Sequence, residues 1–170
     1  EAFFISGGSC NDIENIEKTH GEIISTLLQN SKIIKIVDRD DRSPQEVADF
    51  AKSGIRVLKR RNLESYVLDD AVIKKLCDKV GKPEEYAACI QEKQQALTDS
   101  VFRGNAPDDF KKASGAIYIS LKRHLSLTQC GNNPDPFMRD TLSPLITPDM
   151  DVYKELEAEI FGTDSDGGTT

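Results

Sequence analysis

The sequence predicts an α/β fold in which a small parallel sheet is followed by a helical region. Through the first 68 residues, short apolar stretches alternate with a helical pattern, and such strand–helix–strand alternation is typical of parallel sheets with right-handed crossovers. After Asp69 the pattern is helical. We therefore divide the chain into an α/β part (1–70), a helical part packed on it (71–162) and a polar, glycine-rich tail (163–170) that is expected to be disordered.

The α/β part is predicted to begin with a short strand and a long helix. Residues 3–6 are apolar and lead into a glycine loop at 7–9. Residues 11–29 carry isoleucine and leucine at roughly helical spacing, which predicts an amphipathic helix. A second apolar stretch, 32–38, is predicted to form the next strand.

A short helix after this strand has clear start and stop signals. Ser43 is a good N-cap, Pro44 fits the first helical position, and Glu46 completes a capping box. We expect the helix to run to Lys52 and to stop at Gly54, since glycine is favoured just after a helix.

A third strand is predicted over residues 55–58, and five helical segments follow it. Breaks that contain glycine or proline separate most of these segments. The predicted helices cover residues 70–80, 83–102, 108–125, 137–142 and 149–161. Three strands are few for a parallel sheet, which normally has both faces covered.

Composition and charge narrow the classes of protein to which the chain can belong. It has 170 residues and no apolar run near the roughly 20 needed to cross a bilayer, so we expect a cytoplasmic protein that does not contact membranes. The net charge of −7 argues against tight nucleic-acid binding by this chain alone, because neutralising phosphates needs a basic surface. The four cysteines lack paired spacing, which indicates free thiols rather than a zinc site or a disulfide framework.

The strongest chemical signal lies in residues 36–43, IVDRDDRS, where an apolar strand runs into Asp38 and Asp40. Ligands of open α/β sheets bind at the carboxyl ends of the strands. Side chains two apart in an extended segment point the same way, and hard cations such as Mg²⁺ choose carboxylate oxygens. The alternative is that both aspartates cap the next helix or shape a turn. Asp41, nearer the helix, is expected to be structural.

Three further residues are candidates for the same site. Glu64 follows the third strand and is expected to reach the same sheet edge, although a surface position is the alternative. Lys111 and Lys112 lie in the first turn of a predicted helix. A lysine there would neutralise a transferring phosphate, whereas most lysines in such positions point into water.

Two segments are candidates for phosphate or nucleic-acid contact. The loop Gly7-Gly8-Ser9 lets backbone N–H groups approach a phosphate, although it lacks the spacing of known phosphate-binding loops, and a tight turn is the alternative. Arg60 belongs to the basic run Lys59-Arg60-Arg61, which would contact a nucleic-acid backbone or lie in a solvated loop.

Together, the glycine loop, IVDRDDRS (36–43) and LKRRNLESYVLD (58–69) resemble a known pattern. They look like the TOPRIM (topoisomerase–primase) domain at the C-terminus of OLD-family and related ABC-type ATPases. The match is clearest over residues 3–70. The later helices, including FKKA (110–113) and FMRDTL (137–142), look like the C-terminal extension of that group.

The resemblance implies Mg²⁺- or Mn²⁺-dependent hydrolysis of DNA phosphodiesters. Asp38 and Asp40 match the family's Asp-x-Asp metal ligands, and Glu64 matches an acidic residue after the third strand. Lys112 or Lys111 would offset transition-state charge. The implied partners are DNA, through the full-length protein, and an ATP-binding ATPase domain in cis or in trans. Defence against phage is typical of the group.

One departure from the family pattern concerns the TOPRIM glutamate, which belongs to a strand before the first one seen here. Glu1 has no glycine after it and no room for that strand and helix. We therefore expect this chain alone to lack full nuclease activity. An exposed sheet edge also predicts self-association, for instance as a homodimer.

Two other classes of protein remain as alternatives. A receiver-like phosphoacceptor domain also gathers acidic residues around Mg²⁺, but it needs an acidic pair after the first strand, where this chain has Gly7-Gly8. A non-catalytic interaction module of a larger ATPase fits the low basic charge and the absent glutamate.

Overall fold

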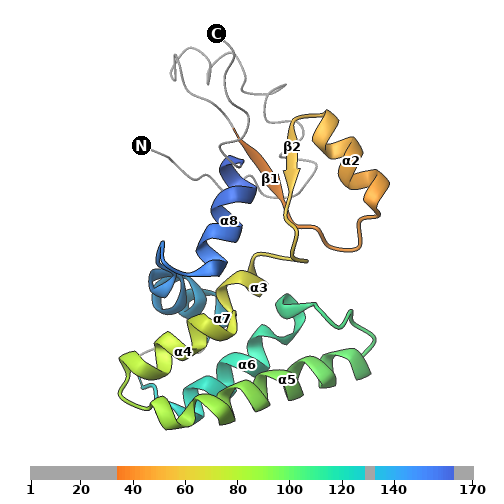
Figure 1. Cartoon of the computed structure of the whole chain (residues 1–170). Helices are drawn as coiled ribbons and strands as arrows, with labels where there is room; N and C mark the ends of the chain where they lie inside the picture. The colour runs from red at the N-terminus through yellow and green to blue at the C-terminus, as the bar shows by residue number, and fades with distance from the viewer. Residues whose placement is uncertain (1–33, 129–132, 163–170) are drawn as a thin grey trace. The chain divides into compact units, whose positions relative to one another are not determined.

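The computed structural model describes residues 34–128 and 133–162 (Figure 1). The strand predicted at 3–6, the loop Gly7-Gly8-Ser9, the helix predicted at 11–29 and the tail 163–170 lie outside the described residues. The described chain is mostly helical with a small two-stranded parallel sheet, which places it broadly in the α/β class. Its contacts divide it into two compact units.

The first unit, here called the α/β unit, comprises described residues 34–37 and 42–57. Strand β1 (Lys35–Val37), helix α2 (Pro44–Lys52) and strand β2 (Ile55–Val57) follow one another along the chain. The two strands pair in parallel, with Lys35 opposite Ile55 and Val37 opposite Val57. The predicted strand–helix–strand order and the parallel pairing of these strands are therefore confirmed.

Helix α2 begins and ends where its local signals predict. The Ser43 hydroxyl accepts a hydrogen bond from the Glu46 N–H at 3.3 Å, and the Glu46 carboxylate accepts one from the Ser43 N–H at 2.8 Å. Gly54 has φ +71°, a left-handed conformation that favours glycine. The capping box and the glycine stop are thus both present.

The second unit, here called the helical unit, comprises residues 38–41 together with the described residues from Leu58 onward. It contains α3 (Glu64–Val67), α4 (Asp70–Lys79), the 3₁₀ turn η1 (Pro83–Glu85), α5 (Tyr86–Phe102), α6 (Phe110–His124), α7 (Pro134–Phe137), the π-helical stretch η2 (Met138–Leu142), the 3₁₀ turn η3 (Ser143–Leu145) and α8 (Asp151–Phe161). These elements match the predicted helices, with bounds shifted by a few residues. Two short helices were not predicted: residues 64–67 form α3, so Glu64 opens a helix, and residues 134–137, just before the helix predicted at 137–142, form α7.

The helical unit has an apolar core of its own. Long helices α5 and α6 pack side by side (Figure 1), and the rings of Tyr118 on α6 and Phe137 on α7 lie 5.0 Å apart between centroids. The largest fully buried apolar side chains are Tyr66, Leu68, Ile73, Leu76, Ile117, Leu121, Phe137 and Leu142. Burial of these side chains is the main stabilising contribution to the unit.

Over the residues that the structure covers, none of the helices combines the length and the apolar character that a membrane span requires.

Candidate functional site

Asp38 is the residue directly after β1, and its carboxylate has contacts with two distant segments of the helical unit. One oxygen, Oδ1, accepts a hydrogen bond from the backbone N–H of Leu63 at 3.1 Å. The other, Oδ2, lies 3.9 Å from Nζ of Lys111 on α6. The side chain keeps 28% of its surface exposed. Within the helical unit, Asp38 therefore contacts both the residue before α3 and the first turn of α6.

Asp40 has a different backbone conformation from the one assumed for it. Its φ is +46°, in the left-handed region that Asp tolerates better than most residues. Its N–H donates to the carbonyl of Arg61 at 2.9 Å, and its side chain is exposed. Because β1 ends at Val37, the rule that extended residues two apart point the same way does not hold here. A shared cation for Asp38 and Asp40 stays a prediction.

Glu64, the first residue of α3, is partly buried beside Asp38 and Lys111. Burial raises the pKa of its carboxyl group; the charges of Asp38 and Asp135 raise it further, and the Lys111 ammonium opposes them. One carboxylate oxygen, Oε2, is buried without a hydrogen-bond partner among the described residues. A buried carboxylate oxygen without a partner is costly, and a bound cation or water would satisfy it.

The two candidate lysines differ in their contacts. Lys111 lies within ion-pair distance of Asp38 and acts electrostatically on Glu64. Lys112 contributes its backbone N–H, which donates to Oδ1 of the helix N-cap Asp109 at 3.1 Å. The structure therefore brings Lys111, rather than the side chain of Lys112, to the two carboxylates.

Arg61 is a residue near this site to which no sequence motif points. Its side chain is only 11% exposed and forms ion pairs with Asp41, with Asp108 at 3.4 Å and with Asp109 at 3.8 Å. Hydrogen bonding to Asp41 raises the pKa of the guanidinium. In the sequence, Arg61 is one of three consecutive basic residues, and nothing in that run distinguishes a buried arginine from a solvated one.

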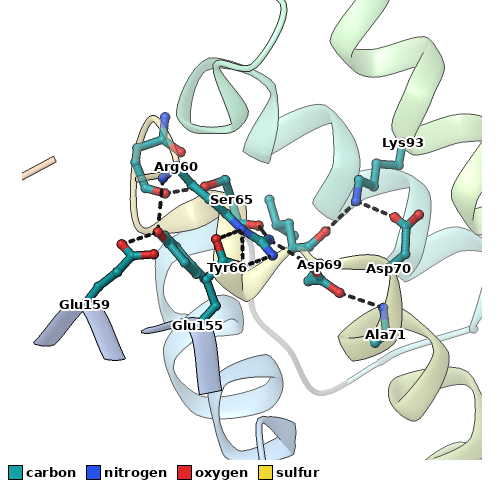
Figure 2. Close-up of polar contacts among 11 residues, drawn as sticks. Arg60, Ser65, Tyr66, Asp69, Asp70, Ala71, Lys93, Glu155 and Glu159 are labelled. Atoms are coloured by element: carbon teal, nitrogen blue, oxygen red, sulfur yellow. Dashed lines mark hydrogen bonds and ion pairs between the residues drawn. The ribbon is translucent and has the colours of Figure 1, made fainter. Parts of the chain in front are cut away.

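Arg60, the neighbouring arginine, forms ion pairs and a hydrogen bond with residues of the helical unit (Figure 2). Its guanidinium pairs with Glu155 at 2.6 Å and with Asp69 at 2.8 Å, and donates to the Ser65 carbonyl at 2.9 Å. It also lies 4.7 Å from the centroid of the Tyr66 ring. The nucleic-acid contact predicted for Arg60 stays a prediction, and a phosphate would have to compete with these carboxylates.

Tyr66 extends the same network toward α8 (Figure 2). Its hydroxyl donates to Oε2 of Glu159 at 2.6 Å and accepts from the backbone N–H of Arg60 at 3.1 Å. Burial and the bond to Glu159 raise the pKa of the phenol. We call Arg60, Tyr66, Asp69, Glu155 and Glu159 the Arg60 cluster; it connects α3 with α8.

A cavity of about 360 Å³ lies beside these arginines. Its walls include three basic and three acidic side chains together with Ser65 and Phe110. The basic groups already have acidic partners; Lys93, for example, pairs with Asp70 and donates to the Leu68 carbonyl, both at 2.6 Å. The cavity is therefore close to charge balance and is not a ready site for an anion.

A divalent cation near Asp38 would have to bind through few protein carboxylates. Within the part of the chain that the structure describes, no group of three or more His, Cys, Asp or Glu side chains is placed to hold a metal ion. Mg²⁺ commonly binds through one or two carboxylates and keeps several waters. At such a site the ligands would be the Asp38 carboxylate and Oε2 of Glu64, which has no hydrogen-bond partner among the described residues.

Comparisons with protein-family models, with curated protein sequences and with solved structures found no match to this chain.

Proposed function

We propose that this chain is the metal-binding portion of a TOPRIM-type DNA endonuclease, which is fused to or partnered with an ATP-binding ABC-type ATPase domain. One observation supports this most: Asp38, Glu64 and Lys111, three residues singled out in the sequence as candidates, lie in one cluster although they are far apart along the chain. Two carboxylates beside a lysine match the needs of a metal-assisted phosphoryl-transfer site.

Each residue has a proposed role in phosphodiester hydrolysis. A bound Mg²⁺ or Mn²⁺ would supply Lewis-acid chemistry and a nucleophilic water. Asp38, held by the Leu63 N–H, and Glu64, with its unpartnered oxygen, would bind the ion. Lys111 would offset the negative charge that develops on the phosphoryl group. Asp40 is proposed as a further ligand, and its exposed side chain supports that assignment only weakly.

DNA binding is proposed for the larger protein rather than for this chain. The net charge is −7, and both Arg60 and Arg61 are neutralised by neighbouring carboxylates. The basic surface that DNA phosphates require would therefore come from another domain.

A second candidate function is a non-catalytic interaction module of the same kind of ATPase. The absence of a three-ligand group among the described residues favours it. The two proposals differ in what Asp38 does: an interaction module would bind its partner equally well after Asp38→Ala and Asp40→Ala.

The first test of the proposed function is calorimetric titration with Mn²⁺ of the parent and of Asp38→Ala, Asp40→Ala and Glu64→Gln. We expect the parent to bind Mn²⁺ and the Asp38 and Glu64 variants to bind it about tenfold or more weakly, because each loses a carboxylate ligand. Asp40→Ala should also weaken Mn²⁺ binding while leaving the fold intact. Asp49→Ala, an exposed residue of α2, is the matched control and should bind like the parent. Equal titrations for the parent and the site variants would refute the metal site.

A further inference from the structure

Arg61 connects the segments that carry the candidate site. Its side chain pairs with Asp41, which follows Asp40 in the segment after β1, and with Asp108 and Asp109 at the N-terminus of α6. Its backbone carbonyl accepts the N–H of Asp40 at 2.9 Å. One residue therefore contacts both the segment that supplies Asp38 and the helix that supplies Lys111.

The low exposure of Arg61 distinguishes its pair with Asp109 from a surface ion pair. Only 11% of its side chain is exposed, and only 15% of that of Asp109. Exposed pairs contribute little, because water screens them, whereas removal of one partner from a buried pair leaves an uncompensated charge. Asp41, by contrast, is 86% exposed, so the buried part of the network is Arg61 with Asp109.

Asp109 connects the first turn of α6 with the residues just before Glu64. Its Oδ1 caps α6 by accepting from the Lys112 N–H at 3.1 Å, and it also accepts from Nδ2 of Asn62 at 3.2 Å. Asn62 is 1% exposed and is followed directly by Leu63, whose N–H holds Asp38. The first turn of α6, which carries Lys111, is thereby tied to the residues just before Glu64.

We propose that Arg61 is the positioning residue of this site: it holds the segment of Asp38 and the first turn of α6 in place, so that the Asp38 and Glu64 carboxylates and the Lys111 ammonium stay together. The expected effect of Arg61 on metal binding rests on the proposed function. Arg61 itself has no proposed contact with metal or substrate and acts through Asp41, Asp108 and Asp109.

Arg60 provides a matched control within the same chain. It is the adjacent residue and an arginine of low exposure (27%) with two carboxylate partners, but those partners are Asp69 and Glu155 rather than the aspartates that Arg61 contacts. Arg60→Gln removes the same chemical group and tests general destabilisation. Arg61→Gln tests destabilisation together with positioning.

The experiment compares Mn²⁺ titrations of the parent, Arg61→Gln, Arg61→Lys and Arg60→Gln. We expect Arg61→Gln to weaken Mn²⁺ binding about tenfold, as loss of a supporting residue around a metal site commonly does, and Arg60→Gln to change it less than twofold. Arg61→Lys should give an intermediate value, because lysine keeps the charge but not the fork of donors. Equal losses for Arg61→Gln and Arg60→Gln would overturn the inference.

A second measurement separates this inference from the proposed function. Amide hydrogen exchange, followed by NMR in the absence of metal, reports on the Leu63 N–H, which donates a hydrogen bond to Asp38. We expect faster exchange at Leu63 and Lys112 in Arg61→Gln than in Arg60→Gln. Unchanged protection at both amides would refute the positioning role, whereas a parent that does not bind Mn²⁺ would refute the proposed function.

Discussion

The α/β unit and the helical unit are stabilised by interactions of different range. In helix α2, the side-chain hydrogen bonds join residues three or four apart, such as Ser43 with Glu46 and Gln45 with Asp49, and no residue of the helix is fully buried. In the helical unit, Arg60 contacts Glu155, which is 95 residues away. Local signals therefore suffice to define α2, whereas the helical unit depends on contacts that form only once the chain has folded.

The largest expected effect of a single substitution is the loss of a buried side chain from the helical unit. Leu76 on α4 is 1% exposed, so Leu76→Ala should lower the free energy of unfolding by about 2–5 kcal/mol through lost burial and the cavity left behind. Chemical denaturation measures this change. Val47→Ala on α2, a partly exposed site, is the control; a comparable loss there would remove the contrast between the units.

A smaller loss is expected from the Arg60 cluster. Arg60→Gln leaves Asp69 and Glu155 without their partner, and hydrogen bonds to charged groups contribute about 1.5–3 kcal/mol. We expect the free energy of unfolding to fall by about 2 kcal/mol. This is below the roughly 3 kcal/mol limit of that range, because water partly screens these side chains. Arg123→Gln, which removes an exposed pair with Glu92, should change stability by less than about 0.5 kcal/mol. Similar values for both variants would show that the Arg60 cluster is no stronger than a surface pair.

The smallest effect is expected at the cap of α2. Ser43→Ala removes the hydroxyl that accepts from the Glu46 N–H, and loss of such a cap costs about 1 kcal/mol. Hydrogen exchange of the α2 amides, measured by mass spectrometry, should show faster exchange in this helix and little change in α5 or α6. Ser43→Thr keeps the hydroxyl and is the control. Uniformly faster exchange across the chain would mean that the two units are more strongly coupled than this comparison implies.

The same contrast explains how much of the fold could be predicted from the sequence. The limits of α2 follow from Ser43, Pro44 and Gly54, and strands β1 and β2 from short apolar runs beside it. Helix α3 was missed because it has four residues, lacks a side-chain cap, and opens with Leu63 as its N-cap. A helix that short has no periodicity to detect.

For the candidate site, residue types could be predicted but their grouping could not. Asp38, Glu64 and Lys111 were each proposed on local grounds, and the structure brings them together. The extended geometry assumed at Asp40 is absent, because β1 ends at Val37 and Asp40 lies in a turn with φ +46°. The role of Arg61 depends on Asp108 and Asp109, 47 and 48 residues further along the chain.

Helix α8 completes the polar contacts of α3 although it lies about 90 residues further along the chain. Glu155 and Glu159, one turn apart on α8, accept from Arg60, from Tyr66 and from the backbone N–H of Lys59. These donors lie just before and within α3. A shortened protein that ends before Asp151 would leave the Arg60 guanidinium with Asp69 as its carboxylate partner and would remove the Glu159 acceptor of the Tyr66 hydroxyl. The C-terminal helix is therefore needed for the polar packing inside the helical unit.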